Sequence, residues 1–153
     1  MKKVLCSACL LGINCRYDGQ GKGFKNIIKT VDEFFIVPIC PEQLGGLPTP
    51  RERAEIRDNK VITLSGRDVT GNFIKGAREA LKIADLLGIK LAIFKQYSPS
   101  CGCGKVYDGS FSGTIIPGNG ITTGLFIQNG IKVITEEDIL KIGQLPLLPY
   151  SDL

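Results

Sequence analysis

Three short apolar runs, each leading into a cysteine, constrain the fold of this chain more than any other feature. Compact runs of this length are typical of buried strands. In an open parallel sheet, the loops that follow the carboxyl ends of the strands line one edge, where such folds bind ligands. We therefore expect the three cysteines to lie close together, although tens of residues separate them in the sequence. The runs span 4–6, 34–39 and 91–94, and they lead to Cys9, Cys40 and Cys101.

Helical patterns separate these runs. The clearest predicted helix spans 72–87, where Phe73, Ala77, Ala80, Leu81, Ala84 and Leu87 share one face and Gly88 provides a stop. Shorter helices are expected at 25–33, at 120–129 and after Thr135, with strands at 61–64 and 131–134, whereas 40–47 and the tail 145–153 are predicted to be irregular. Alternating strands and helices predict an α/β fold. We expect one three-layer, Rossmann-like domain with a mostly parallel sheet over 1–153.

The overall composition is that of an ordinary globular protein. The chain has 153 residues, of which 43% are hydrophobic and 22% charged. No apolar run approaches the ~20 residues that span a bilayer, and the first residues do not resemble a signal peptide. The net charge of +4 suits a small anionic substrate without demanding nucleic acid. We expect a cytoplasmic protein that binds neither DNA nor membrane; these patterns do not indicate its oligomeric state.

The chain has six cysteines and no histidine. Without a secretion signal, the cysteines favour thiol or metal chemistry over disulfides. The absence of histidine excludes histidine-based triads, histidine-liganded zinc and a histidine general base. Proton transfer must therefore fall to Asp, Glu, Lys, Tyr, Cys or water.

The cysteines alone leave several kinds of site open. A single free cysteine is most often a small buried hydrophobe, and this remains the interpretation for Cys6, inside the first strand. Cys15 and Cys103 could be a fourth ligand, a redox partner or merely nearby. Structural zinc usually requires four protein ligands, whereas an iron–sulfur cluster with three leaves one iron open to a substrate atom. A thiol redox protein would use Cys6/Cys9 or Cys101/Cys103.

Short blocks around these cysteines resemble the thiouracil desulfurase (thiouridylate desulfidase) family. Each block is weak by itself, but their order and spacing over Cys6 to Ile134 are specific. The blocks are Ser7-Ala8-Cys9-Leu10-Leu11-Gly12, Cys15-Arg16-Tyr17-Asp18-Gly19, Cys40-Pro41-Glu42, Gly45-Gly46-Leu47, Pro50-Arg51, Ala54-Glu55, Gly66-Arg67-Asp68-Val69-Thr70, Ser98-Pro99-Ser100-Cys101-Gly102, Tyr107-Asp108-Gly109 and Phe111-Ser112-Gly113.

The resemblance implies an activity and a set of site residues. It implies a 4Fe–4S cluster whose open iron takes the sulfur of a thiolated pyrimidine base or nucleotide, so that C=S becomes C=O and sulfide is released. It also implies catalytic roles for a glutamate and a serine. The implied cluster ligands are Cys9, Cys40 and Cys101, and the implied catalytic residues are Glu42 and Ser98, with Ser100 competing. A non-catalytic iron–sulfur or zinc module and a thiol redox protein are the alternatives.

Several other polar residues could take part. Arg16, Arg51 and Arg53 could bind a nucleotide phosphate through paired donors, although a solvated surface is more typical of any one of them. Residues 118–120 could cradle a phosphate, although a plain loop is more common. Asp68 and Asp108 are expected to cap helices or form turns.

Overall fold

The computed structural model describes residues 2–28 and 33–142, and a parallel sheet lies at its centre. The sheet order is β2-β1-β5-β8, and every pair within it is parallel. This arrangement confirms the predicted α/β fold with a mostly parallel sheet. The sheet strands are β1 (Lys2–Ser7), β2 (Phe34–Ile39), β5 (Leu91–Phe94) and β8 (Lys132–Thr135).

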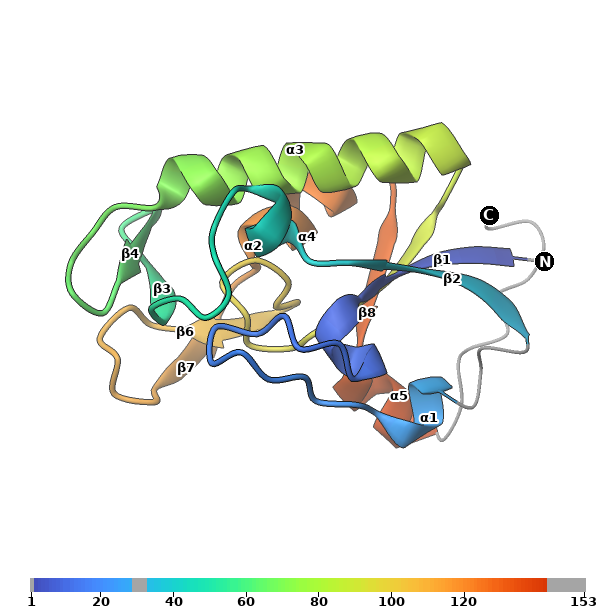
Figure 1. The fold of residues 1–153 in the computed structure, drawn as a ribbon, viewed down its shortest axis with the longest axis horizontal. Coiled ribbons are helices and arrows are strands. Elements are labelled where there is room, and N and C mark those ends of the chain that lie inside the picture. The colour runs from blue at the N-terminus through green and yellow to red at the C-terminus, as the bar shows by residue number, and fades with distance from the viewer. Residues whose placement is uncertain (1, 29–32, 143–153) are drawn as a thin grey trace.

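Helices cover both faces of the sheet (Figure 1). On one face lie α3 (Thr70–Leu87) and α4 (Ile121–Gln128), and on the other lie α1 (Lys25–Ile28) and α5 (Glu136–Ile142). Successive strand residues point to opposite faces. Leu5, for example, packs with Ala80, Ala84 and Phe126, whereas Val4 and Cys6 pack with Ile27 and Ile139. The result is the predicted three-layer arrangement.

The strand order places a topological switch point between β1 and β5. The chain passes from β1 to β2 on one side of it and later returns to β5 on the other, so the winding direction reverses there. Ligands of open α/β sheets bind at such a switch point, outside the carboxyl ends of the strands. The register aligns these ends, because Ser7 pairs with Ile39 and Cys6 with Ile93.

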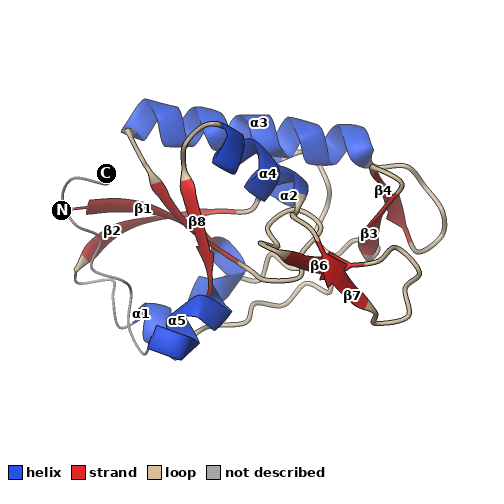
Figure 2. Cartoon of the chain, turned by 180° about the vertical axis from the view of Figure 1, so that it is seen from behind, coloured by secondary structure: helices blue, strands red, loops and turns tan. Residues whose placement is uncertain are grey.

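Two small hairpins lie beyond this edge of the sheet, and both views show them at the same end of the molecule (Figures 1 and 2). They are β3 (Ala54–Arg57) with β4 (Lys60–Thr63), and β6 (Lys105–Tyr107) with β7 (Ile115–Pro117). The strand expected at 61–64 corresponds to β4, while β3, β6 and β7 were not predicted. Asp58 and Asn59 have positive φ at the tight β3–β4 turn, as residues of primed hairpin turns do.

One prediction is wrong: residues 40–47 are not wholly irregular. Pro41–Leu44 form α2, a single helical turn in which Leu44 N donates to Cys40 O over 3.0 Å. Pro41 suits the first helical position because its fixed φ is helical and no N–H is needed there. Immediately after β1, the short 3-10 helix η1 (Ala8–Leu11) likewise forms a single turn.

The other predicted elements agree with the structure to within a few residues. The helix expected at 72–87 begins two residues earlier, at Thr70, whose amide donates to Asp68 Oδ1 over 2.9 Å. Asp138 accepts hydrogen bonds from Thr135 N and Oγ1 at the start of α5. Of the helix predicted at 25–33, residues 29–32 lie outside the described residues, as does the tail 145–153. None of the described helices combines the length and apolar character that a bilayer span requires. That 1–153 form one domain stays a prediction.

Candidate functional site

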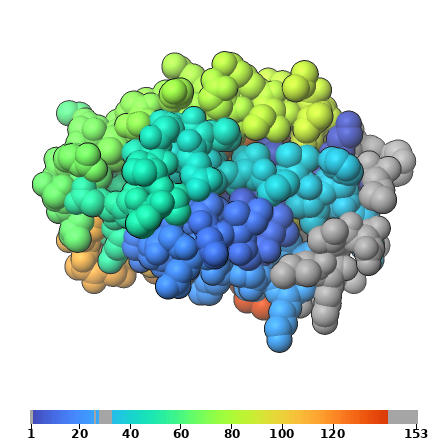
Figure 3. Space-filling model, in the orientation of Figure 1, coloured from blue at the N-terminus to red at the C-terminus, as the bar shows by residue number. Residues whose placement is uncertain are grey.

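A cavity of about 540 Å³ lies at the carboxyl edge of the sheet, within the size range of small-molecule sites. The segments after β1, β2 and β5 meet there. In the space-filling view, the segment after β1 (blue) lies against the segment that carries α2 (teal) (Figure 3); Arg51 N also donates to Tyr17 O between these segments over 2.8 Å. The residues that line the cavity include Cys9, Cys15, Cys40, Glu42, Arg51, Tyr97, Ser98, Cys101, Tyr107 and Phe111.

The structure brings Cys9, Cys40 and Cys101 to this one cavity, as the strand-end argument predicts. Cys9 lies in η1 directly after β1, and Cys40 is the residue between β2 and α2. Cys101 lies in the loop that follows β5. Cys9 is 8% exposed and Cys101 is 4% exposed, so both residues form part of the buried wall of the cavity.

The surroundings of Cys40 and Cys101 disfavour the thiolate when no metal is bound. Burial raises the pKa of Cys101 to about 12, although hydrogen bonds with Ser7 and Ser100 partly oppose the shift. The pKa of Cys40 is also raised, first by its hydrogen bond with Cys15 and then by burial. Buried thiols with such pKa values are poor nucleophiles at neutral pH. This disfavours simple thiol redox chemistry.

The other three cysteines occupy different environments. Cys6 is fully buried within β1, and burial is the main cause that raises its pKa to about 12. Cys103 does not line the cavity, and its Sγ lies 3.9 Å from Val133 O. Cys15 does line the cavity, and its carbonyl oxygen accepts from Cys40 Sγ over 3.7 Å. Of the three, only Cys15 is therefore placed to contact a bound group.

Glu42 projects from α2 into the cavity beside Arg51. Arg51 Nε donates to Glu42 Oε1 over 3.2 Å, and the side chains are 5% and 19% exposed. Burial raises the pKa of Glu42, and Arg51 opposes this shift through its charge and its hydrogen bond. The expectation that Arg51 lies on a solvated surface is thus wrong: this guanidinium is buried and organises the site.

The structure distinguishes the two candidate serines. Ser98 lines the cavity, and its Oγ accepts from Ser100 N and Cys101 N, both over 3.1 Å. Ser100 is 1% exposed and does not line the cavity; its Oγ lies 3.0 Å from Thr122 Oγ1. Ser98 is therefore the serine placed to contact a bound molecule, and Ser100 joins the loop to α4.

The remaining polar candidates are paired within the protein. Arg16 pairs with Asp18 over 3.8 Å, and Arg53 pairs with Glu55 over 3.2 Å. Asp108 accepts from Ser110 N over 2.9 Å, the turn contact expected of it. Residues 118–120 do not line the cavity; instead, Asn119 Oδ1 accepts from Gly104 N and supports the loop that carries Cys101.

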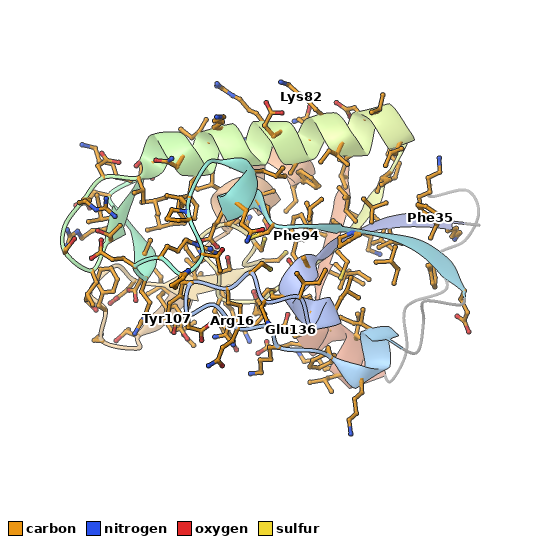
Figure 4. All side chains as sticks on the ribbon, in the orientation of Figure 1. Arg16, Phe35, Lys82, Phe94, Tyr107 and Glu136 are labelled. Atoms are coloured by element: carbon orange, nitrogen blue, oxygen red, sulfur yellow. The ribbon has the colours of Figure 1, made fainter. Side chains whose placement is uncertain are left out.

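The loop after β5 is held by residues that no sequence pattern singles out. Glu136 accepts from Lys95 Nζ and from Gln96 N, both over 2.8 Å. Gln96 in turn contacts the backbone of Cys103 twice: Nε2 donates to the carbonyl and Oε1 accepts from the amide. In Figure 4, Arg16, Tyr107 and Glu136 lie to one side of Phe35, which is near the other end of the sheet. No local sequence pattern signals these long-range contacts.

Comparison with known proteins identifies the family. A family model described as 2-thiouracil desulfurase matches residues 4–138. The chain belongs to the 2-thiouracil desulfurase family. It is 43% identical over 146 residues to the Bacillus subtilis (strain 168) protein described as uncharacterized protein YbbK, an alignment that covers 89% of this chain and 97% of that protein.

A solved structure agrees with the family in fold. The protein described as 4Fe-4S-dependent thiouracil desulfidase TudS superposes with a TM-score of 0.88 at 43% identity, covering 94% of this chain and 96% of its own. Because the match extends over nearly all of both chains, this desulfurase-family member and that protein share one fold.

Proposed function

We propose that this protein removes sulfur from a thiolated pyrimidine by hydrolysis, using a 4Fe–4S cluster bound by Cys9, Cys40 and Cys101. Water supplies the oxygen, so that C=S and H₂O give C=O and hydrogen sulfide without net oxidation or reduction. One observation supports the proposal more strongly than any other. The three strand-end cysteines line a single cavity together with Glu42 and Ser98, in a chain of the 2-thiouracil desulfurase family.

The residues at the cavity fit such a cluster. Cysteine thiolates are the usual protein ligands of iron–sulfur clusters, and three separate loops offer them here. Cys9, Cys40 and Cys101 all line the cavity, so their thiolates can contact one group bound there.

When bound through three cysteines, the cluster supplies one open iron that can act as a Lewis acid toward the thiocarbonyl sulfur. Glu42 is the general base of the proposal: its carboxylate accepts a proton from the attacking water and returns it to a ring nitrogen or to the departing sulfur. Ser98 Oγ accepts hydrogen bonds from two backbone N–H groups, which leaves its own proton to orient the water or the exocyclic oxygen of the pyrimidine. The buried wall of the cavity limits competing water.

Anaerobic iron–sulfur reconstitution followed by a sulfide-release assay tests the proposal. The substrates are 2-thiouracil and a thiouridine monophosphate, and the visible spectrum and iron content are recorded for the same samples. We expect a broad brown absorbance, about four irons per chain and release of sulfide with formation of the oxo-pyrimidine. Cys9→Ala, Cys40→Ala and Cys101→Ala should each abolish release.

The same measurements separate the alternatives. A cluster without sulfide release from either compound would leave a non-catalytic iron–sulfur module and refute the proposed activity. Zinc uptake without iron would refute the cluster. Full activity in any one of the three cysteine variants would refute the assignment of ligands.

A further inference from the structure

Two aromatic residues that line the cavity have an unusual backbone conformation. Among the described residues, four that are not glycine have positive φ, and two of these, Asp58 and Asn59, form a hairpin turn. The other two are Tyr97 (φ 68°) and Phe111 (φ 57°), and both line the cavity. The left-handed region is rare for bulky residues and persists only where surrounding contacts hold it, often at functional sites.

A buried carboxylate holds Phe111 in this conformation. Glu55 in β3 is 2% exposed. Its Oε1 accepts from Phe111 N and from Gly109 N, both over 3.1 Å, and its Oε2 accepts from Arg53 Nη2 over 3.2 Å. The Arg53 guanidinium lies 5.9 Å from the centre of the Phe111 ring. The ring is thus fixed through its backbone and through one neighbouring cation.

The loop between β6 and β7 is also pressed closely against β3. A Cβ atom added to Gly109, which has φ +90°, would lie 2.6 Å from Arg57 Cβ and 2.7 Å from Ile56 O. Only glycine fits this approach without displacing one of the two segments. The position of Phe111 is therefore determined by the β3–β4 hairpin rather than by its own loop.

Tyr97 is fixed in a comparable way from the loop after β5. Its hydroxyl donates to Glu137 Oε1, its ring lies 5.9 Å from that of Tyr107, and Lys95 Nζ lies 5.7 Å from its ring centre. Because the hydroxyl is already used, Tyr97 presents its ring to the cavity rather than a free hydrogen-bond donor. The loop after β5 thus contributes one fixed aromatic ring, that of Tyr97, and the loop between β6 and β7 contributes a second, that of Phe111.

We propose that Phe111 is a specificity-determining residue whose ring packs against the planar pyrimidine, and that Glu55 is the positioning residue that holds it there. The inference rests on the proposed function. It assigns to Phe111, held by Glu55, the selection of a planar heteroaromatic substrate. Base–aromatic stacking contributes substantially to the binding of nucleobases and is tolerant of the base's identity. Fixing the ring in advance lowers the entropy cost of binding, which gives the unusual backbone conformation of Phe111 a physical reason.

The test compares Phe111→Ala, Phe111→Tyr and Glu55→Gln with Phe35→Ala as the matched control. Phe35 is 57% exposed on β2, at the opposite end of the sheet from the cavity (Figure 4). The reconstituted proteins are assayed for KM and kcat with 2-thiouracil, for Kd with uracil by calorimetry, and for iron content. Uracil has no thiocarbonyl sulfur, so its binding reports ring contacts.

For Phe111→Ala we expect KM and the uracil Kd to rise about 10- to 100-fold, with unchanged iron content and kcat within about threefold. Phe111→Tyr and Phe35→Ala should resemble the parent protein. Glu55→Gln should raise KM less than Phe111→Ala does, and combining the two should raise it no further, because Glu55 acts through Phe111. A purely structural role for Glu55 would instead add to the effect of Phe111→Ala.

Unchanged uracil affinity in an iron-loaded Phe111→Ala protein would overturn the inference, as would a parent protein that binds no uracil. Additive effects in the double variant would overturn the positioning role of Glu55. If the parent protein binds uracil but releases no sulfide, the proposed function fails while the calorimetric comparison still decides whether Phe111 contacts the ring.

Discussion

Arg51 Nε lies 3.2 Å from Glu42 Oε1 at the cavity wall, with only 5% of the Arg51 side chain exposed. The other guanidinium nitrogens donate to Cys15 O, Pro48 O and Thr49 Oγ1 over 2.9 to 3.2 Å. One planar side chain therefore connects the candidate general base with the segment that follows β1. Because the fork geometry of arginine allows these contacts together, lysine could not replace it.

Breaking this buried pair should cost far more stability than breaking an exposed pair of the same length. Removing one partner of a buried pair leaves an uncompensated charge, at a cost of about 3 kcal/mol. Arg67 Nη2 also lies 3.2 Å from its partner, Glu52, but 69% of its side chain is exposed, so water screens this pair and its loss should cost much less. We expect Arg51→Met to lower the free energy of unfolding by about 3 kcal/mol and Arg67→Met to lower it far less.

Urea denaturation of the metal-free proteins measures both values and avoids a transition coupled to cluster loss. Arg51→Lys should recover little of the stability, since the lysine ammonium cannot reproduce the fork. Equal stabilities of Arg51→Met and Arg67→Met would show that the Arg51–Glu42 pair is not the organising contact described above.

The cysteines should divide into two groups when each is replaced by serine. Cys103 does not line the cavity, and its backbone makes the contacts to Gln96, so Cys103→Ser should retain about four irons. Cys15→Ser should also retain them, because serine keeps the carbonyl that contacts Arg51 and Cys40 and replaces the thiol that contacts Cys9 and Cys40 by a hydroxyl that can make the same hydrogen bonds. Cys101→Ser should lose most of the iron. Iron analysis after anaerobic reconstitution decides this, and loss of iron in Cys15→Ser would make Cys15 a ligand.

The two candidate serines should differ in what their loss affects. Ser98 lines the cavity, so we expect Ser98→Ala to lower kcat about 10- to 100-fold, as loss of one positioned hydrogen-bonding group does, while Ser98→Thr retains more activity. Ser100→Ala should lower kcat less than Ser98→Ala does, because Ser100 does not line the cavity and its hydroxyl contacts Cys101 Sγ, over 3.7 Å, and Thr122. It should lower the free energy of unfolding by about 1 kcal/mol, because Thr122 Oγ1 loses its buried partner.

Sulfide-release kinetics and urea denaturation are measured for each serine variant, with iron content as the control. A cluster-loaded Ser98→Ala protein with parental kcat would remove Ser98 from the chemistry. A large loss of kcat in Ser100→Ala at unchanged stability would reverse the assignment.

Much of the fold follows from local patterns in the sequence. The apolar period of 3.6 over 72–87 and the short runs at 34–39 and 91–94 are enough to predict an α/β layer structure with a parallel sheet. The turn at Pro41–Leu44 was missed because one helical turn is too short to show a period, while proline and glycine nearby are typical of loops. The three-residue strands β6 and β7 were missed for the same reason.

The candidate site was predictable only where strand direction determines position. Cys9, Cys40 and Cys101 follow three parallel strands, so topology alone brings them to one edge. Glu55 and Phe111, by contrast, meet through a hydrogen bond across 56 residues of sequence, and the guanidinium of Arg51 contacts Cys15, 36 residues earlier, as well as Glu42. Such contacts depend on how the hairpins pack over the sheet edge, which no local pattern encodes.

Two glycines of one helix provide a final test of how the site is built. In α3, a Cβ atom added to Gly76 would lie 1.8 Å from Pro41 O, whereas one added to Gly71 would meet nothing within 4 Å. Gly76 therefore lets α3 approach the turn that carries Cys40 and Glu42. Gly76→Ala must push that turn away, and we expect it to lower the free energy of unfolding by about 3 kcal/mol and to reduce iron retention. Gly71→Ala should instead raise stability by about 0.5–1 kcal/mol, since alanine favours the helix. Urea denaturation and iron analysis of both variants measure these effects, and a Gly76→Ala protein as stable and iron-rich as Gly71→Ala would contradict the close approach of α3 to α2 on which the placement of Cys40 depends.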